Sequence, residues 1–150
     1  MDGAGTRAVR PVLAEVGRVN TLFAVEAAPP GPGWLPLGGG GALESRVLAA
    51  EVERTRNRLA ELAGCAGAVV EWRVAASVFQ QGLATRLLSP VLSAGLCHGA
   101  LVDAARFHWD PHREGPVVLR TSQEEAAAVT GGTAELADWV ERTVVLGVLA

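Results

Sequence analysis

The sequence lacks several features on which whole classes of proteins depend. It contains no Lys, Ile or Tyr and only two Cys in 150 residues. Every basic residue is therefore Arg, and these residues are spread thinly from Arg7 to Arg142, with a formal net charge of -3. A protein that binds nucleic acid needs a concentrated cationic surface. The sequence therefore predicts no nucleic-acid partner.

The sequence also lacks the signals of export and membrane insertion. Its longest weakly charged stretch, Val74–Val102, is interrupted by Arg86, Pro90, Gly95 and two glutamines. A membrane-spanning helix needs about 20 apolar residues without such interruptions. The first residues, Met1–Gly5, do not show the charged and then apolar pattern of a signal peptide. We therefore expect a cytoplasmic protein with no membrane span.

No complete catalytic set is visible. Cys65 and Cys97 stand alone, with no C-x-x-C pair, and a disulfide scaffold or four-cysteine metal site would need more thiols. We expect both to be buried free thiols, because an unpaired Cys behaves as a small hydrophobic residue. No histidine has an obvious nucleophile as partner. Gly38–Gly41 lacks the following Lys and Ser or Thr of a phosphate-binding loop. The sequence thus assigns no catalytic residue.

The three histidines, His98, His108 and His112, lie close together in the sequence. His108 and Asp110 would share one face of a strand, and His112 or Cys97 would complete a plausible metal shell. The solvated polar face of a hairpin explains the same residues equally well. We therefore assign no metal ligand in this chain.

The residues that are present favour one mostly helical domain. The composition is 49% hydrophobic, which is enough for a core at this length. Apolar residues at helical spacing predict helices over Thr6–Ala27, Ala42–Ala63, Ala68–Leu88, Val91–His98 and from Thr133 onward. Gly64 should end the second of these helices, and Gly99 should end the fourth. Ser89-Pro90 should interrupt the helical structure between the third helix and the fourth. The third is apolar around most of its circumference, which is typical of a helix in the middle of a fold.

Two other segments complete the predicted fold. Pro29–Gly41 is too rich in Pro and Gly for regular structure, and Trp34 and Leu37 within it should pack back onto the domain. Alternation in Phe107–Asp110 and the run Pro116–Arg120 predict a β-hairpin, followed by a helical turn or two within Ser122–Val129. The fold class is therefore α+β, mostly helical, with one small antiparallel β-hairpin or sheet.

The last residues, Thr143–Ala150, form an apolar run without a polar cap or charged tail. Natural C-termini usually lie exposed. We expect residues 1–150 to be a single domain that forms the N-terminal and central portion of a longer protein.

The third predicted helix carries the candidate ligand-binding residues. At about 100° per residue, Arg73, Ser77 and Gln80 fall in one narrow polar stripe. Arg86 lies on the far side, among apolar residues. A buried guanidinium needs a partner, which would be a carboxylate such as Glu71 or Asp103, backbone carbonyl groups, or an anionic ligand. All three interpretations of Arg86 stay open at this point.

One stretch resembles a known family. The pattern R-x-x-A-S-x-x-x-x-G-x-A-x-R-L-x-S-P is matched by Arg73, Ala76, Ser77, Gly82, Ala84, Arg86, Leu87, Ser89 and Pro90. Downstream come Cys97-His98-Gly99, Trp109 and Gly115-Pro116, in that order. This arrangement resembles the actinobacterial FhuF-like proteins, the ferric-siderophore reductase family. The similarity covers roughly residues 43–150.

The resemblance implies a cytoplasmic role in removing iron from imported ferric siderophores. The family's redox chemistry resides in a C-terminal cysteine cluster that binds a [2Fe–2S] centre, and such centres need thiolate ligands. Neither Cys65 nor Cys97 matches that cluster. The expected role is therefore the ligand-binding, non-cluster part of a siderophore-iron reductase, with no cofactor held by this chain itself. The alternatives are a binding or interaction module without redox activity, and a degenerate remnant without activity.

Overall fold

The computed structural model describes residues 5–39, 45–111, 113 and 115–149. Four α-helices provide most of the structure: α1 (Val9–Gly17), α2 (Ser45–Ala63), α3 (Trp72–His98) and α4 (Gly132–Val140). The last continues directly into a π-helical segment, η4 (Glu141–Leu149). Short 3-10 turns are η1 (Thr21–Phe23), η2 (Gly67–Val69) and η3 (Ala104–Arg106). The prediction of a mostly helical α+β protein is confirmed.

Seven short strands among the described residues form two sheets, rather than the single hairpin or sheet that we predicted. The strands are β1 (Thr6–Ala8), β2 (Glu26–Ala27), β3 (Leu35–Pro36), β4 (Ala100–Leu101), β5 (Phe107–Trp109), β6 (Leu119–Thr121) and β7 (Glu125–Ala128). One sheet has the order β1-β7-β4 and is antiparallel throughout. The other has the order β2-β6-β5-β3, in which only β2 and β6 run parallel.

The predicted hairpin is the centre of the second sheet. β5 and β6 pair antiparallel, with Phe107 opposite Thr121 and Trp109 opposite Leu119. The predicted return of the Pro- and Gly-rich segment onto the domain is also confirmed. Leu37 is 1% exposed, and the guanidinium of Arg120 stacks 4.3 Å from the centre of the Trp34 ring.

The prediction of one helix over Thr6–Ala27 is wrong. The first three residues form β1 and pair with β7, so that Ala8 and not Thr6 precedes the helix. α1 then ends at Gly17. The prediction of a helical turn within Ser122–Val129 is also wrong, because β7 is inserted between β1 and β4. Exposed and buried residues alternate along β7, and Ala126 and Ala128 are the buried ones. Pairing with distant strands outweighs the helix propensity of the alanines.

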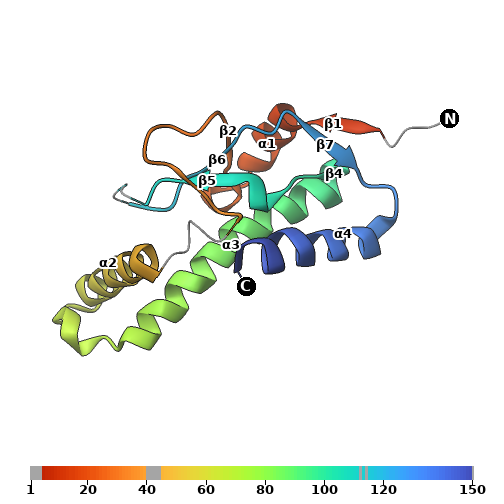
Figure 1. Cartoon of the computed structure of the whole chain (residues 1–150). Coiled ribbons are helices and arrows are strands. Elements are labelled where there is room, and N and C mark those ends of the chain that lie inside the picture. The colour runs from red at the N-terminus through yellow and green to blue at the C-terminus, as the bar shows by residue number, and fades with distance from the viewer. Residues whose placement is uncertain (1–4, 40–44, 112, 114, 150) are drawn as a thin grey trace.

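α3 is the longest helix and joins the two parts of the molecule (Figure 1). We predicted a break at Ser89-Pro90, but the helix continues through Pro90 to Gly99, where a left-handed φ of 62° ends it. Proline removes one helical hydrogen bond. Pro90 and Val91 are fully buried, so packing of the neighbouring elements holds the helix together at this point.

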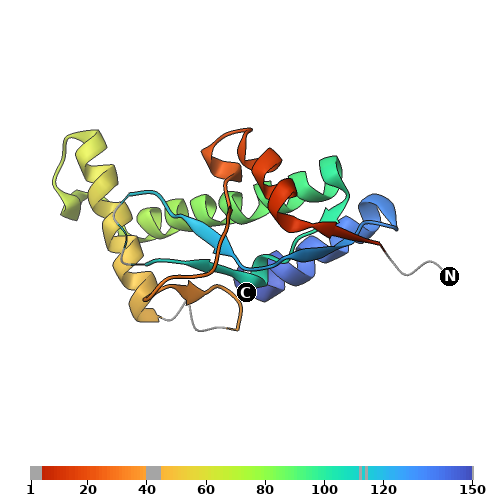
Figure 2. The same ribbon diagram turned by 90° about the horizontal axis from the view of Figure 1, so that it is seen from above.

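The apolar circumference of α3 predicted a helix that is buried in the middle of the fold. This prediction is wrong for the N-terminal half of α3. Trp72, Val74 and Val78 are 45%, 46% and 40% exposed. This half projects from the rest of the protein together with α2, as Figures 1 and 2 show. We call residues 45–82, which comprise α2, η2 and the first part of α3, the arm, and the remaining described residues the body.

The core lies in the body. Its fully buried side chains include Val9, Val16, Leu37, Leu87, Val91, Phe107, Trp109 and Val144. α1 and α4 both contact α3. The indole nitrogen of Trp139 in α4 donates a 2.9 Å hydrogen bond to the carbonyl of Val102. The body therefore holds the C-terminal half of α3 from several sides.

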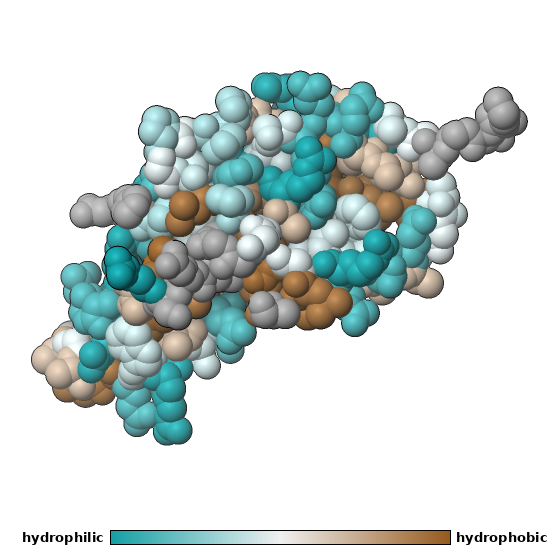
Figure 3. All heavy atoms as spheres, in the orientation of Figure 1, coloured by the Kyte–Doolittle hydropathy of each residue, from teal (hydrophilic) through white to brown (hydrophobic). Residues whose placement is uncertain are grey.

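The C-terminal apolar run is partly packed and partly exposed. Val144 and Val148 of η4 are buried in the core, whereas Val145 and Leu146 are 44% and 61% exposed. Figure 3 shows brown, apolar surface beside this segment. No helix among the described residues is long and apolar enough to cross a membrane.

Candidate functional site

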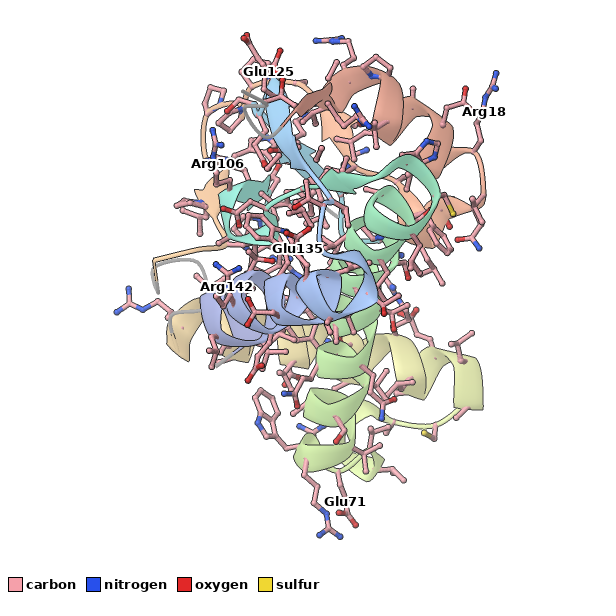
Figure 4. The ribbon with its side chains drawn as sticks, turned by 90° about the vertical axis from the view of Figure 1, so that its right-hand side faces the viewer. Arg18, Glu71, Arg106, Glu125, Glu135 and Arg142 are labelled. Carbon is pink, nitrogen blue, oxygen red and sulfur yellow. The ribbon has the colours of Figure 1, made fainter. Side chains whose placement is uncertain are left out.

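The four predicted ligand-binding residues do not form one site. Figure 4 shows Glu71 at the tip of the arm, and the Nε of Arg73 donates a 2.7 Å hydrogen bond to the carboxylate of Glu71. Ser77 is exposed on the same face. Gln80 is exposed but borders a small apolar cavity, and Arg86 lies on another face at the edge of the body. Helix geometry therefore separates Arg86 from the other three.

Arg86 instead faces a cleft that three segments enclose. α2 forms one wall, α3 the second, and Gly115, Pro116 and Val117, which precede β6, the third. The cleft has a volume of about 230 Å³. We call it the arginine cleft, and its described lining residues are Glu51, Arg54, Thr55, Arg58, Leu59, Val78, Phe79, Gly82, Leu83, Arg86, Gly115, Pro116 and Val117.

Two of the arginines hold the walls of the arginine cleft in place. Arg54 of α2 donates hydrogen bonds to the carboxylate of Glu51 and to the backbone carbonyl of Pro111, which follows β5. Arg86 of α3 donates a 3.4 Å hydrogen bond from Nη1 to the carbonyl of Thr21 in η1. Arg54 therefore ties the arm to the body, whereas the hydrogen bond of Arg86 joins two elements of the body.

Positive charge is in excess in the arginine cleft. Three guanidinium groups and one carboxylate are present among its described lining residues. Partial burial and the nearby charge of Arg58 both lower the pKa of Arg86. An arginine side chain stays protonated even so. The electrostatic field in the cleft therefore favours an anionic ligand.

The carboxylates that we predicted as partners of Arg86 are engaged elsewhere. Glu71 pairs with Arg73 at the tip of the arm. Asp103 accepts a 2.9 Å hydrogen bond from the backbone of Ala105 and so caps η3.

The rest of the lining is apolar. Phe79 and Leu83 of α3 face Val117 and Leu59 across the cleft. The ring of Phe79 packs 6.4 Å, centre to centre, from that of the buried Trp109, which fixes its position. At Gly82 a Cβ atom would meet no heavy atom within 4 Å. The cleft thus combines guanidinium groups with an apolar, partly aromatic wall and an open floor at Gly82.

A second cavity of about 210 Å³ lies beside the first, beyond Phe79 and Leu83. It is lined by Leu48, Val52, Ala76, Phe79, Gln80, Leu83 and Leu149. Gln80 is the one strongly polar side chain in this set. The cavity therefore suits an apolar group better than a charged one.

Sequence reasoning missed the contribution of α2. The sequence analysis assigned no ligand-binding residue to this helix, yet Glu51, Arg54 and Arg58 line the arginine cleft. Arg54 and Arg58 are four residues apart and therefore lie on the same side of the helix. That spacing was the available signal, but the cleft exists only because Gly115, Pro116 and Val117 lie opposite α2 in the tertiary fold.

The suggested metal shell is not assembled within the part of the chain that the structure describes. His108 is half-buried on β5, and its Nδ1 atom has no hydrogen-bond partner among the described residues. His112 lies outside these residues, and Cys97 is exposed near the end of α3. No group of three potential metal ligands occurs among the described side chains.

The cysteines do not fit a [2Fe–2S] centre. Neither cysteine is buried as we predicted: Cys65 is half-buried between α2 and α3, and Cys97 is exposed at the other end of α3. A helix rises about 1.5 Å per residue, so more than about 30 Å separates the two ends of α3. Such a cluster takes four protein ligands, and two distant thiols in one molecule do not provide them.

Comparison of the chain with protein-family models, with curated proteins and with solved structures finds no match in any of the three.

Proposed function

We propose that this chain is the ligand-binding, non-cluster part of a cytoplasmic siderophore-iron reductase of the FhuF type, and that the arginine cleft holds the ferric siderophore. One observation carries the proposal. Gly82 and Arg86, two residues of the pattern that resembles this family, line the same cleft as Phe79, Arg54 and Arg58. The resemblance and the cleft therefore point to the same place on α3.

The chemistry of the lining suits such a ligand. A ferric siderophore presents oxygen atoms around the iron and apolar or aromatic groups farther out. Guanidinium groups donate hydrogen bonds to anionic oxygens in a rigid fork. Phe79, Leu83 and Val117 supply an apolar surface for the remainder of the ligand.

The size of the cleft limits how much of the ligand it holds. Pockets that enclose a drug-sized ligand have about 300–1,000 Å³, and the arginine cleft has about 230 Å³. It therefore binds one side of a ferric chelate and leaves the other side open. Electrons for reduction would reach the iron from that open side, from a donor outside these residues.

A binding module without redox activity is the second candidate. It is favoured by the two cysteines, which are too few and too far apart for the family's cluster. The arginine cleft would serve this function unchanged. Reduction of a bound ferric chelate, measured with and without an added iron–sulfur electron donor, separates the two candidates.

A pair of substitutions at Gly82 tests the site itself. Gly82→Phe should fill the arginine cleft, whereas Gly82→Ala adds a single methyl group in open space. We would titrate the wild-type protein and both variants with a ferric trihydroxamate and with a ferric tris-catecholate, following quenching of tryptophan fluorescence. Wild type and Gly82→Ala should bind at least one chelate saturably, and Gly82→Phe should bind about tenfold more weakly or not at all.

Circular dichroism melts of the same proteins check that both variants are folded. The proposal is wrong if neither chelate binds to the wild-type protein. It is also wrong if a folded Gly82→Phe protein binds as tightly as wild type.

A further inference from the structure

The outward face of α3 carries almost no charge, although much of it is exposed. Within residues 74–97 every exposed residue of this helix is uncharged, and the single charged residue, Arg86, is half-buried. The outward face of α2 differs, because it presents Arg46, Glu53 and Glu61 to water. A solvated helix face normally carries charged side chains. The composition of α3 is therefore that of a face which another surface covers.

The exposed apolar residues of this face lie in one line along α3, the pale green helix that rises from Glu71 in Figure 4. At about 100° per residue, they all lie within about 20° of Thr85 around the helix axis. They are between 37% and 63% exposed. We call them, together with Thr85, the α3 stripe: Val74, Val78, Thr85, Leu92 and Leu96. Isolated exposed apolar residues are ordinary, but a line of them along one helix forms a continuous surface.

The α3 stripe has the same arrangement when it is followed from either end. Val78 and Leu92 each lie seven residues from Thr85, and Val74 and Leu96 each lie eleven residues from it. In an antiparallel pair of α3 helices with a twofold axis at Thr85, Val78 would meet Leu92 of the second copy. Val74 would meet Leu96 in the same way, and Thr85 would meet its own counterpart. A twofold interface has to be self-complementary in this sense.

We propose that the α3 stripe is a homodimer interface, in which α3 packs antiparallel against α3 of a second copy. Val78, Thr85 and Leu92 recur at the seven-residue interval of packed helix pairs. The middle of the face holds the uncharged Gln81 and Thr85, so no like charges meet when it packs against itself. A partner of different sequence would not need the symmetry about Thr85. This inference does not depend on the proposed function.

The dimer would bring the second copy to the arginine cleft. Val78 belongs both to the α3 stripe and to the lining of that cleft. Leu92 of the second copy, which would contact Val78, would therefore lie at the edge of the cleft. The two clefts of the dimer would open close to the same twofold axis.

Substitutions at Thr85 test the interface at its centre. Thr85→Arg and Thr85→Glu each place two like charges face to face on the twofold axis, whereas a mixture of the two proteins places opposite charges there. Thr85 is exposed, so both variants should fold, which thermal melts check. Leu146→Arg adds a charge at an exposed apolar residue of η4, outside the α3 stripe, and is the matched control. Sedimentation equilibrium from about 5 µM to about 0.5 mM measures the self-association of each protein and of the mixture.

We expect the wild-type protein to dimerise with a dissociation constant of about 100 µM or lower, as a small interface allows. Thr85→Arg and Thr85→Glu should each dimerise about tenfold more weakly or not at all. Their mixture should form a heterodimer about as tightly as wild type forms its dimer. Leu146→Arg should change the dissociation constant by about twofold at most.

Three results would overturn the proposal. If wild type is still a monomer at about 0.5 mM, a second copy does not cover the α3 stripe. If both Thr85 variants dimerise as tightly as wild type, or if Leu146→Arg weakens the dimer as much as they do, the dimer forms through another surface. If the mixture does not recover the affinity that the separate Thr85 variants lose, Thr85 does not meet its counterpart on a twofold axis.

Discussion

The two halves of α3 have similar apolar composition and opposite surroundings. In the arm half, Ala75 is fully buried, while Trp72, Val74 and Val78 are each at least 40% exposed. In the body half, Leu83, Leu87, Pro90, Val91, Ala94 and Gly95 are all buried. An apolar helix is thus buried only as far as other elements surround it, and the arginine cleft lies where the two halves meet. The predictions below test this difference.

The largest expected difference between body and arm is in the free energy of unfolding that is lost when an apolar side chain of α3 is truncated. Leu87 is 0% exposed, so Leu87→Ala should lower the free energy of unfolding by about 2–5 kcal/mol. Val74 in the arm is 46% exposed, so Val74→Ala should change it by about 0.5 kcal/mol at most. Urea unfolding followed by circular dichroism measures both. Equal losses would show that the arm is packed as tightly as the body.

Two glycines of α3 should respond to alanine with opposite signs. A Cβ atom at Gly95 would collide with the side chain of Leu136 in α4, so Gly95→Ala should destabilise by about 1–3 kcal/mol. At Gly82 there is open space, and Gly82→Ala should stabilise by up to about 1 kcal/mol through better helix propensity. Thermal melts of the two variants give the signs directly. Stabilisation by both would contradict the close packing of α4 on α3.

Hydrogen bonds of the body should matter more than those of the arm. The buried Gln123 side chain accepts a 3.0 Å hydrogen bond from the Asp103 N–H and donates one of 2.9 Å to the Asp103 carbonyl. Gln123→Met leaves these groups unpaired and should cost about 1–3 kcal/mol. In the arm, the guanidinium of Arg56 donates hydrogen bonds to the carbonyls of Val70 and Ala68.

Water can replace the Arg56 bonds, because Ala68 is exposed and Val70 only half-buried. Arg56→Met should therefore cost less than Gln123→Met, about 1 kcal/mol or below. Unfolding in urea, with both variants in the same buffer, tests the order. The reverse order would mean that the turn between α2 and α3 limits stability.

The smallest expected effect is on the pH dependence of stability, through Glu135 in the first turn of α4. Hydrogen bonds from the backbone N–H groups of Thr130 and Gly131 lower the pKa of Glu135 below its ordinary value of 4.5. The stabilising contribution of this carboxylate is therefore present above pH 4.5 and is lost as the pH falls through the lowered value.

We expect Glu135→Gln to lower the melting temperature slightly at pH 7, and the difference from wild type to shrink in acid. Glu61→Gln, at an exposed position of the arm, serves as the control for the loss of one carboxylate. A Glu135→Gln deficit that is the same at neutral and acid pH would contradict the assignment.

Local signals predicted the local elements of this fold. The stripe of α2 and the glycines that end α2 and α3 were sufficient for those boundaries, since Gly64 and Gly99 both adopt a positive φ. β1 and β7 were missed because their structure depends on pairing between residues more than a hundred positions apart. No pattern within Glu125–Ala128 distinguishes a paired strand from a helical turn.

The candidate site, like the fold, could be predicted from the sequence only in part. Arg86 stood out as the one cation on an otherwise apolar face, and the structure places it at the arginine cleft. Arg58 did not stand out, because a charged residue on an amphipathic helix is ordinarily solvated. Its importance follows from the position of Pro116 and Val117 across the cleft, which only the tertiary fold determines.

The pairing of β1 with β7 bears on the order of events during folding. Thr6 lies opposite Ala127, and β4 completes the sheet from the middle of the chain. Closing so long a loop is entropically unfavourable until other contacts have brought its ends together. On the ribosome, β1 must wait until almost all of the described chain has emerged. We therefore expect α2 and α3 to form early from local contacts, and the three-stranded sheet to complete the native state last.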